Sequence, residues 1–81
     1  MKQYPSLKEA IAKEDYEIEL IYENGERRRY DFRSDLEHPF YQELKEVERF
    51  LKVSVLQGEL VWEGGQDFCP HTLYEKSVKM K

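Results

Sequence analysis

The sequence has little of what marks exported, membrane-spanning or disulfide-linked proteins. Cys69 is the only cysteine among 81 residues, so no internal disulfide can form and the fold does not depend on oxidation. No apolar run approaches the ~20 residues that cross a bilayer, and Met1 to Tyr4 shows no apolar leader core. We therefore expect a cytoplasmic protein without a membrane segment.

The sequence also lacks an excess of positive charge. It has 13 Lys and Arg against 17 Asp and Glu, a formal net charge of -4 and a pI near 5.2. The run Arg27-Arg28-Arg29 is the one feature that suggests phosphate binding, because guanidinium groups neutralise phosphates. Strand alternation splits that run between two faces, and nearby glutamates surround it. Contact with nucleic acid through Arg27 to Arg29 is therefore an unfavoured alternative, and it predicts binding that weakens steeply with salt.

A β-hairpin is the clearest positive feature. Alternation from Tyr16 to Tyr22 puts every second, largely apolar side chain on one face, and Tyr30 and Phe32 continue the pattern after the turn. A two-residue loop at Asn24-Gly25 would set Ile18 opposite Asp31 and spoil that face. A three-residue loop with Gly25 in the left-handed conformation pairs Tyr16 with Phe32 and Ile18 with Tyr30, and we predict this register.

The opposite face of this hairpin carries a mixed polar and apolar set. The predicted register places Glu19 opposite Arg29, as a charge pair, and Ile21 opposite Arg27. Because this face is not needed for the core, Ile21, Arg27 and Arg29 are the candidate residues for contact with a protein partner.

The remaining segments predict short elements. Ser6 and Glu9 have capping-box spacing, so local propensity favours a helix at 7–13. The apolar positions Phe40, Leu44, Val47 and Leu51 recur at helical spacing and predict one or two helical turns over the open face of the sheet.

A second hairpin follows with a two-residue loop. Turning at Gln57-Gly58 pairs Val55 with Leu60 and Val53 with Trp62. Gly64-Gly65 ends that strand, Asp67-Phe68 resumes it, and Pro70 pre-sets the first turn of a helix that holds Leu73 and Tyr74. We expect one domain over 1–81, and we allow for a disordered tail at 77–81.

Asp67, Cys69 and His71 are the chemistry-bearing residues that lie closest together. His71 and Glu75 would sit one helical turn apart, a spacing that a metal can use, and Cys69 with His71 suggests nucleophilic catalysis. In the alternative reading Asp67 and Thr72 cap the helix and His71 faces water. A closed zinc site needs four ligands, so we expect no metal, no other cofactor and no enzyme, and we keep a metal-binding protein or enzyme using these three residues as the rival class.

Several motifs resemble one known family. In order these are Asp15-Tyr16, Asn24-Gly25-Glu26, Tyr30-Asp31-Phe32, Phe40 with Leu44, Phe50 with Val53, Val61-Trp62, Gly65, Asp67, and Pro70 with Leu73-Tyr74. Together they are similar to the small bacterial domain of unknown function 2442, from Pro5 to Glu75. The resemblance implies a strand before Asp15, so we place Leu7 to Ala12 in the sheet against the helical signal.

The fold that results is an α+β domain. Its antiparallel sheet consists of two β-hairpins plus an N-terminal strand, with short helices covering one face and a short C-terminal helix. The resemblance carries no established activity, but some family members look like components of toxin-antitoxin pairs. The leading hypothesis is a non-enzymatic protein-interaction module, an antitoxin-like partner of a small neighbouring protein or a self-associating chain.

Overall fold

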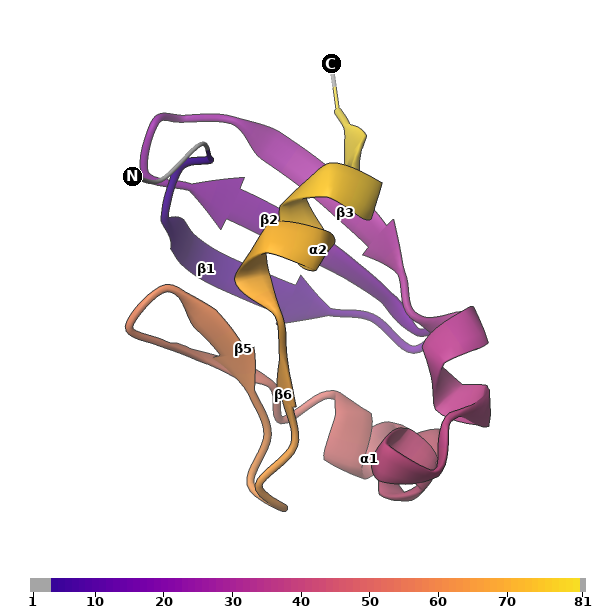
Figure 1. Cartoon of the computed structure of the whole chain (residues 1–81). Coiled ribbons are helices and arrows are strands. Elements are labelled where there is room, and N and C mark those ends of the chain that lie inside the picture. Colours follow the sequence, from indigo (N-terminus) through magenta and orange to yellow (C-terminus); the bar gives the residue numbers. More distant parts are fainter. Residues whose placement is uncertain (1–3, 81) are drawn as a thin grey trace.

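The computed structural model of the chain describes residues 4–80, so the expectations for residues 1–3 and for Lys81 lie outside the described residues. Within these described residues, seven short strands and four short helices follow one another (Figure 1). Their bounds are β1 (Leu7–Ala12), β2 (Glu17–Tyr22), β3 (Arg27–Asp31), the 3-10 helices η1 (Arg33–Glu37) and η2 (Pro39–Lys45), α1 (Val47–Phe50), β4 (Ser54–Leu56), β5 (Glu59–Val61), β6 (Asp67–Phe68), α2 (Pro70–Lys76) and β7 (Val78–Lys79).

The strands form two antiparallel sheets. The first has the order β1-β2-β3-β7 and the second the order β4-β5-β6, while α2 crosses one face of the first sheet (Figure 1). The α+β class is confirmed, but the two hairpins lie in different sheets instead of one. The helical segment η1-η2-α1 separates them, and the second hairpin turns its apolar side chains toward the shared core, so the two sheets are joined by packing.

The register of the first hairpin is confirmed. Ile18 pairs with Tyr30, and the Phe32 amide donates to the Tyr16 carbonyl at 3.0 Å just beyond the ladder. The loop between Tyr22 and Glu26 holds three residues, and Gly25 has φ of 89°. A side chain would strain the backbone in this left-handed conformation, so glycine is the residue that lets the rings of both strands share one face.

The strand implied for Leu7–Ala12 is confirmed as β1. It pairs antiparallel with β2, with Ala10 opposite Leu20 and Ala12 opposite Ile18, after an irregularity between Leu7 and Glu9. The hydrogen bonds and apolar contacts of this edge position override the helical propensity of the segment, since propensity differs among ordinary residues by well under ~1 kcal/mol each.

The second hairpin also has its predicted register. Val55 pairs with Leu60 across a two-residue loop in which Gln57 and Gly58 both have positive φ, 52° and 82°. Two positive φ values are the signature of the tight turn whose twist matches that of a hairpin. Phe68 of β6 then pairs with Leu60, so the predicted return of the chain after the two glycines is confirmed.

The helical spacing predicted from Phe40 to Leu51 is only partly right. Leu44 is buried, but Phe40 and Leu51 are 49% and 39% exposed, and Phe50 is buried in their place. The cause is that η2 is a 3-10 helix that ends before α1 begins, so the period of 3.6 residues is not kept across the segment. None of the helices within residues 4–80 has the length and apolar character needed to span a membrane.

Aromatic rings make up the centre of the core. Phe32 is fully buried, and its ring centroid lies between 5.1 and 6.3 Å from those of five other rings. These rings belong to Tyr30, Tyr41, Phe50, Trp62 and Phe68, which come from both sheets and the helical segment. Large rings thus supply much of the buried area in a short chain.

We allowed for a disordered tail at 77–81, but residues 77–80 pack and pair with the rest of the fold. Ser77 is buried, and Val78 pairs with Arg29 as part of β7. The amide of Met80 donates to the Arg27 carbonyl at 2.8 Å. The tail is ordered because the outer edge of β3 offers it backbone partners, which local sequence does not reveal.

Candidate functional site

The nominated contact residues lie on the face of the first sheet that points away from α2. Strand alternation places Ile21, Arg27 and Arg29 on this face, because their neighbours Leu20 and Tyr30 point into the core. Ile21 is half-buried, whereas 58% of the Arg27 side chain is exposed. We call this surface the outer sheet face.

Charge pairing on the outer sheet face differs from the expectation. Glu19 lies opposite Arg29 in the ladder, as predicted, but its carboxylate bonds Arg27 at 2.6 Å and Lys13 at 3.3 Å. The hydrogen bond from Arg27 and then that from Lys13 lower the pKa of Glu19. Arg29 makes no ion pair with any residue from 4 to 80, so its guanidinium keeps its capacity for a carboxylate.

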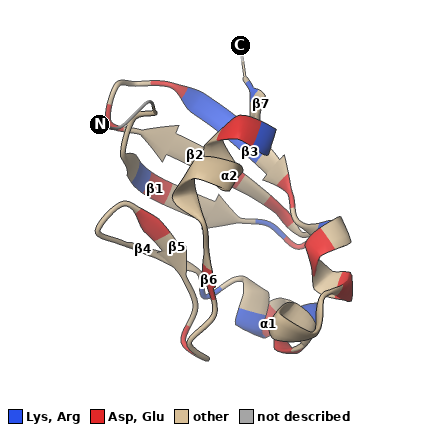
Figure 2. Ribbon diagram, in the orientation of Figure 1, with Lys and Arg blue, Asp and Glu red and all other residues tan. Residues whose placement is uncertain are grey.

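Arg28 is separated from its two neighbours by the alternation of the strand. Its guanidinium donates to Glu26 at 2.8 Å and to the hydroxyl and carbonyl of Ser77 at 2.6 and 3.0 Å, and it lies 4.3 Å from the Tyr74 ring centroid. Figure 2 shows the basic run at the start of β3 with acidic segments on either side of it. The three arginines therefore do not form one basic surface.

Sequence reasoning found Ile21 but missed two other apolar side chains of the outer sheet face. Ile11 on β1 is 45% exposed, and it shares the face with Ile21 because its ladder partner is Glu19. Val78 on β7 is 56% exposed and stands opposite Arg29. The alternation of Val78 and Met80 was the signal that could have found the second of these, had the tail been treated as a strand.

The resulting arrangement is suited to protein contact. Arg29, which has no ion pair within residues 4–80, stands beside exposed aliphatic side chains on a regular sheet. Arginine is enriched where proteins bind one another, and the buried centre of such an interface is more apolar than its rim. Such a face offers charge recognition and burial of apolar area.

The rival group does not come together as a site. Asp67 is on the exposed side of β6, Cys69 precedes α2, and the His71 ring pairs with Glu75 at 3.1 Å and stacks on Tyr4. The pairing of His71 with Glu75 follows the predicted spacing. Within residues 4–80 no three His, Cys, Asp or Glu side chains lie together in a way that could hold a metal.

The capping expected from Asp67 and Thr72 is wrong in detail. The N-cap of α2 is Cys69, and Pro70 occupies the first helical position. Thr72 acts on the thiol instead: its backbone amide and then its side chain favour the thiolate and lower the pKa of Cys69. Cys69 is exposed, so this effect is measurable in solution.

We expect iodoacetamide to alkylate Cys69 with a pH profile whose midpoint lies below that of free cysteine. Thr72→Val removes the hydroxyl and should move the midpoint upward, because the thiolate loses a donor, whereas Ser54→Ala should leave it in place. Alkylation rate against pH measures both. Since His71 is paired with Glu75, His71→Gln should not move the midpoint; a clear shift would favour the Cys-His reading.

The comparisons with known proteins give one result. The family model described as "Protein of unknown function (DUF2442)" matches residues 7–79. No curated protein and no solved structure matched.

Proposed function

The chain belongs to the DUF2442 family, a family without an assigned activity, and from this premise we propose that it is a small cytoplasmic, non-enzymatic protein-interaction module. Its contact surface is the outer sheet face, and its partner is a protein that presents a carboxylate to Arg29 among apolar side chains. The observation that carries this proposal is that Arg29 has no ion pair within residues 4–80 while its cross-strand neighbour Glu19 is held by Arg27 and Lys13.

Two further features support the choice of this surface. Ile11 and Val78 are about half exposed on the same face, so a partner would bury apolar area around the arginine. Conversely, Arg28 is bound to Glu26 and Ser77 and Arg27 is paired with Glu19, so Arg29 is the member of the basic run without an ion pair within residues 4–80. A surface with acidic residues interspersed in this way suits a protein better than a phosphate backbone.

The family resemblance suggests one form of this function. The partner would then be a small protein encoded beside this one, with the present chain as the antitoxin-like component. The alternative partner at the outer sheet face is a second copy of the chain, and the test below distinguishes it from a different protein.

The test compares matched charge reversals. Arg29→Glu should abolish binding of the partner recovered by the wild type, because it places a carboxylate against the partner's carboxylate, a repulsion of several kcal/mol. Lys76→Glu changes net charge equally on α2, which covers the other face, and should bind as the wild type does. Co-purification with the neighbouring protein, followed by a binding titration with each variant, measures the difference.

Several outcomes would contradict the proposal. Equal loss of binding in both variants would point to a general charge effect, and equal retention would remove the outer sheet face from the interaction. If the protein sediments as a monomer and no partner is found whose binding depends on Arg29, the proposal that the chain is a protein-interaction module is wrong. Retained nucleic acid that is released steeply by salt would favour the regulator alternative.

A further inference from the structure

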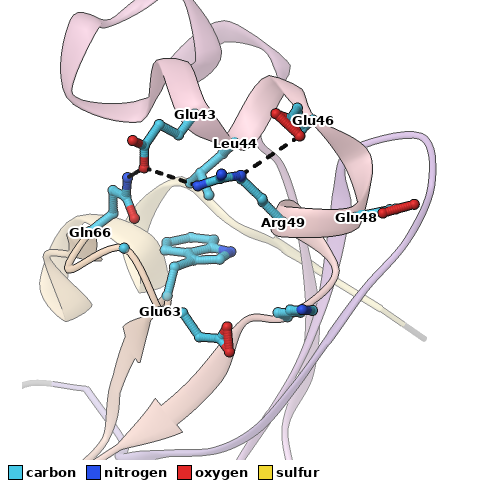
Figure 3. A pocket seen from close by; sticks show the side chains of 10 residues that line it. Glu43, Leu44, Glu46, Glu48, Arg49, Glu63 and Gln66 are labelled. Atoms are coloured by element: carbon cyan, nitrogen blue, oxygen red, sulfur yellow. Dashed lines mark hydrogen bonds and ion pairs between the residues drawn. The ribbon is translucent and has the colours of Figure 1, made fainter.

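A pocket of about 420 Å³ lies away from the outer sheet face, between η2, α1 and the turn that joins β5 to β6 (Figure 3). Its volume falls in the range of small-molecule sites. Leu44 and Trp62 give it apolar walls, and Gln66 and several charged side chains provide polar ones.

Gln66 is the unusual member of the lining. It is a polar residue that is only 6% exposed, and its Nε2 donates to Glu43 Oε1 at 3.1 Å. Its Oε1 is buried and accepts no hydrogen bond from any residue that the structure describes. Because the Glu43 carboxylate only accepts hydrogen bonds, the amide nitrogen must face it and the oxygen must face away. Figure 3 shows that oxygen on the side of the carboxamide turned away from Glu43.

Gly64 leaves room for this arrangement. A Cβ at position 64 would lie 2.7 Å from Gln66 Oε1 and 2.9 Å from Glu43 Oε1, closer than real contacts allow. The terminal torsion of a glutamine is broad, so a modest rotation of the carboxamide presents Oε1 to an occupant of the pocket. The pocket wall therefore contains an acceptor to which no group of residues 4–80 donates.

The charges around the pocket favour a cation. Its lining includes four carboxylates, from Glu43, Glu46, Glu48 and Glu63, against the two cations of Arg49 and Lys52. Arg49 lies 3.6 Å from Glu43 and 3.7 Å from Glu46. The Glu63 carboxylate makes no ion pair within residues 4–80 and is left to balance the charge of a ligand.

We propose that this pocket binds an alkylammonium group. One N–H of the ammonium donates to Gln66 Oε1, Glu63 balances the charge, and the alkyl stem packs between Leu44 and Trp62. An ammonium fits the buried end of the site better than a guanidinium, since the unpartnered acceptor there is a single carbonyl oxygen, which does not match a planar two-donor fork. The group can come from a free aliphatic amine or from a lysine side chain of another protein. This inference does not depend on the proposed function.

Trp62 makes the proposal directly testable, because it is the only tryptophan of the chain and lines the pocket. Titration with 1,4-diaminobutane at constant ionic strength should change its fluorescence with saturation, at a Kd of about 0.1–1 mM as suits so small a ligand. 1,4-Butanediol has the same stem without the charge and should give no saturable change. A short lysine peptide that binds more tightly than the diamine would identify a protein lysine as the source, and the reverse order would identify a free amine.

Variants separate this site from nonspecific effects. Gln66→Met keeps the volume, removes the acceptor and should weaken diamine binding at least tenfold, whereas Gln42→Met, on the exposed side of η2, should not. Glu63→Gln should weaken diamine binding severalfold, whereas the control Glu23→Gln should bind the diamine as the wild type does. If Gln66→Met does not fold, the comparison of Glu63→Gln with Glu23→Gln tests the proposal. Equal binding of the diol, wild-type affinity in both Gln66→Met and Glu63→Gln, or no saturable change at all would overturn the proposal.

Discussion

Phe32→Ala should lower the free energy of unfolding by about 3–5 kcal/mol, the cost of deleting a buried phenylalanine ring. Phe32 is fully buried and its ring contacts five others, so the neighbours cannot close the cavity without losing contacts to both sheets and the helical segment. An 81-residue chain has a total stability of roughly 4–12 kcal/mol. The variant should therefore lose roughly a quarter or more of its stability.

Urea unfolding measures this change, with far-ultraviolet circular dichroism as the signal because Trp62 fluorescence itself senses Phe32. Phe40→Ala deletes the same ring at a position that is 49% exposed and should cost less than half as much. Equal losses in the two variants would mean that Phe32 is not the centre of the core.

Arg28→Met should lower the free energy of unfolding by about 2–3 kcal/mol. We expect a much smaller loss from the same substitution at the neighbouring Arg29. Only 14% of the Arg28 side chain is exposed, and the substitution deletes its bonds to Glu26 and Ser77 and its position over Tyr74. Those bonds connect α2 and β7 to β3. Hydrogen bonds to a partly buried charged group are among the stronger ones.

Arg29→Met is the matched control for that measurement. Arg29 lies on the outer sheet face without an ion pair in residues 4–80, so the same substitution should change stability by no more than about 0.5 kcal/mol. If both variants lost equal stability by urea unfolding, the division of the basic run between two faces would be wrong. Arg29→Glu sets a carboxylate opposite Glu19, so its own urea unfolding is needed to show that a loss of partner binding reports on contact and not on folding.

Glu26 illustrates how local and distant partners combine in the network around Arg28. Hydrogen bonds from Asn24 and then from Tyr74 lower the pKa of Glu26 to about 2, and the bond from Arg28 adds to the effect. Asn24 belongs to the hairpin loop, whereas Tyr74 belongs to α2 at the other end of the chain. The carboxylate thus ties the turn of the first hairpin to the C-terminal helix.

The two proposed sites use different parts of the molecule. The outer sheet face is formed by β1, β2, β3 and β7, whereas the pocket at Gln66 is formed by η2, α1 and the turn after β5. Arg29→Glu and Gln66→Met therefore test independent statements, and failure of one leaves the other unaffected.

Both hairpins could be predicted from the sequence alone, because their registers depend on neighbouring residues. Alternation between Tyr16 and Phe32, with a glycine where φ must be positive, leaves one pairing that keeps the rings together. The same reasoning holds for Val55 and Leu60 around Gln57-Gly58. Placing Ile21, Arg27 and Arg29 on one face followed directly from the first register.

Tertiary structure alone decided the rest, since it depends on groups that are distant in sequence. Pairing with β2 makes a strand of Leu7–Ala12 despite its helical propensity, and the free edge of β3 makes a strand of Val78–Lys79. Which arginine holds Glu19, and which amide oxygen in the pocket lacks a donor, follow from the reach of side chains in three dimensions. Local periodicity specifies which face a residue occupies, but only the packed chain specifies what that residue meets there.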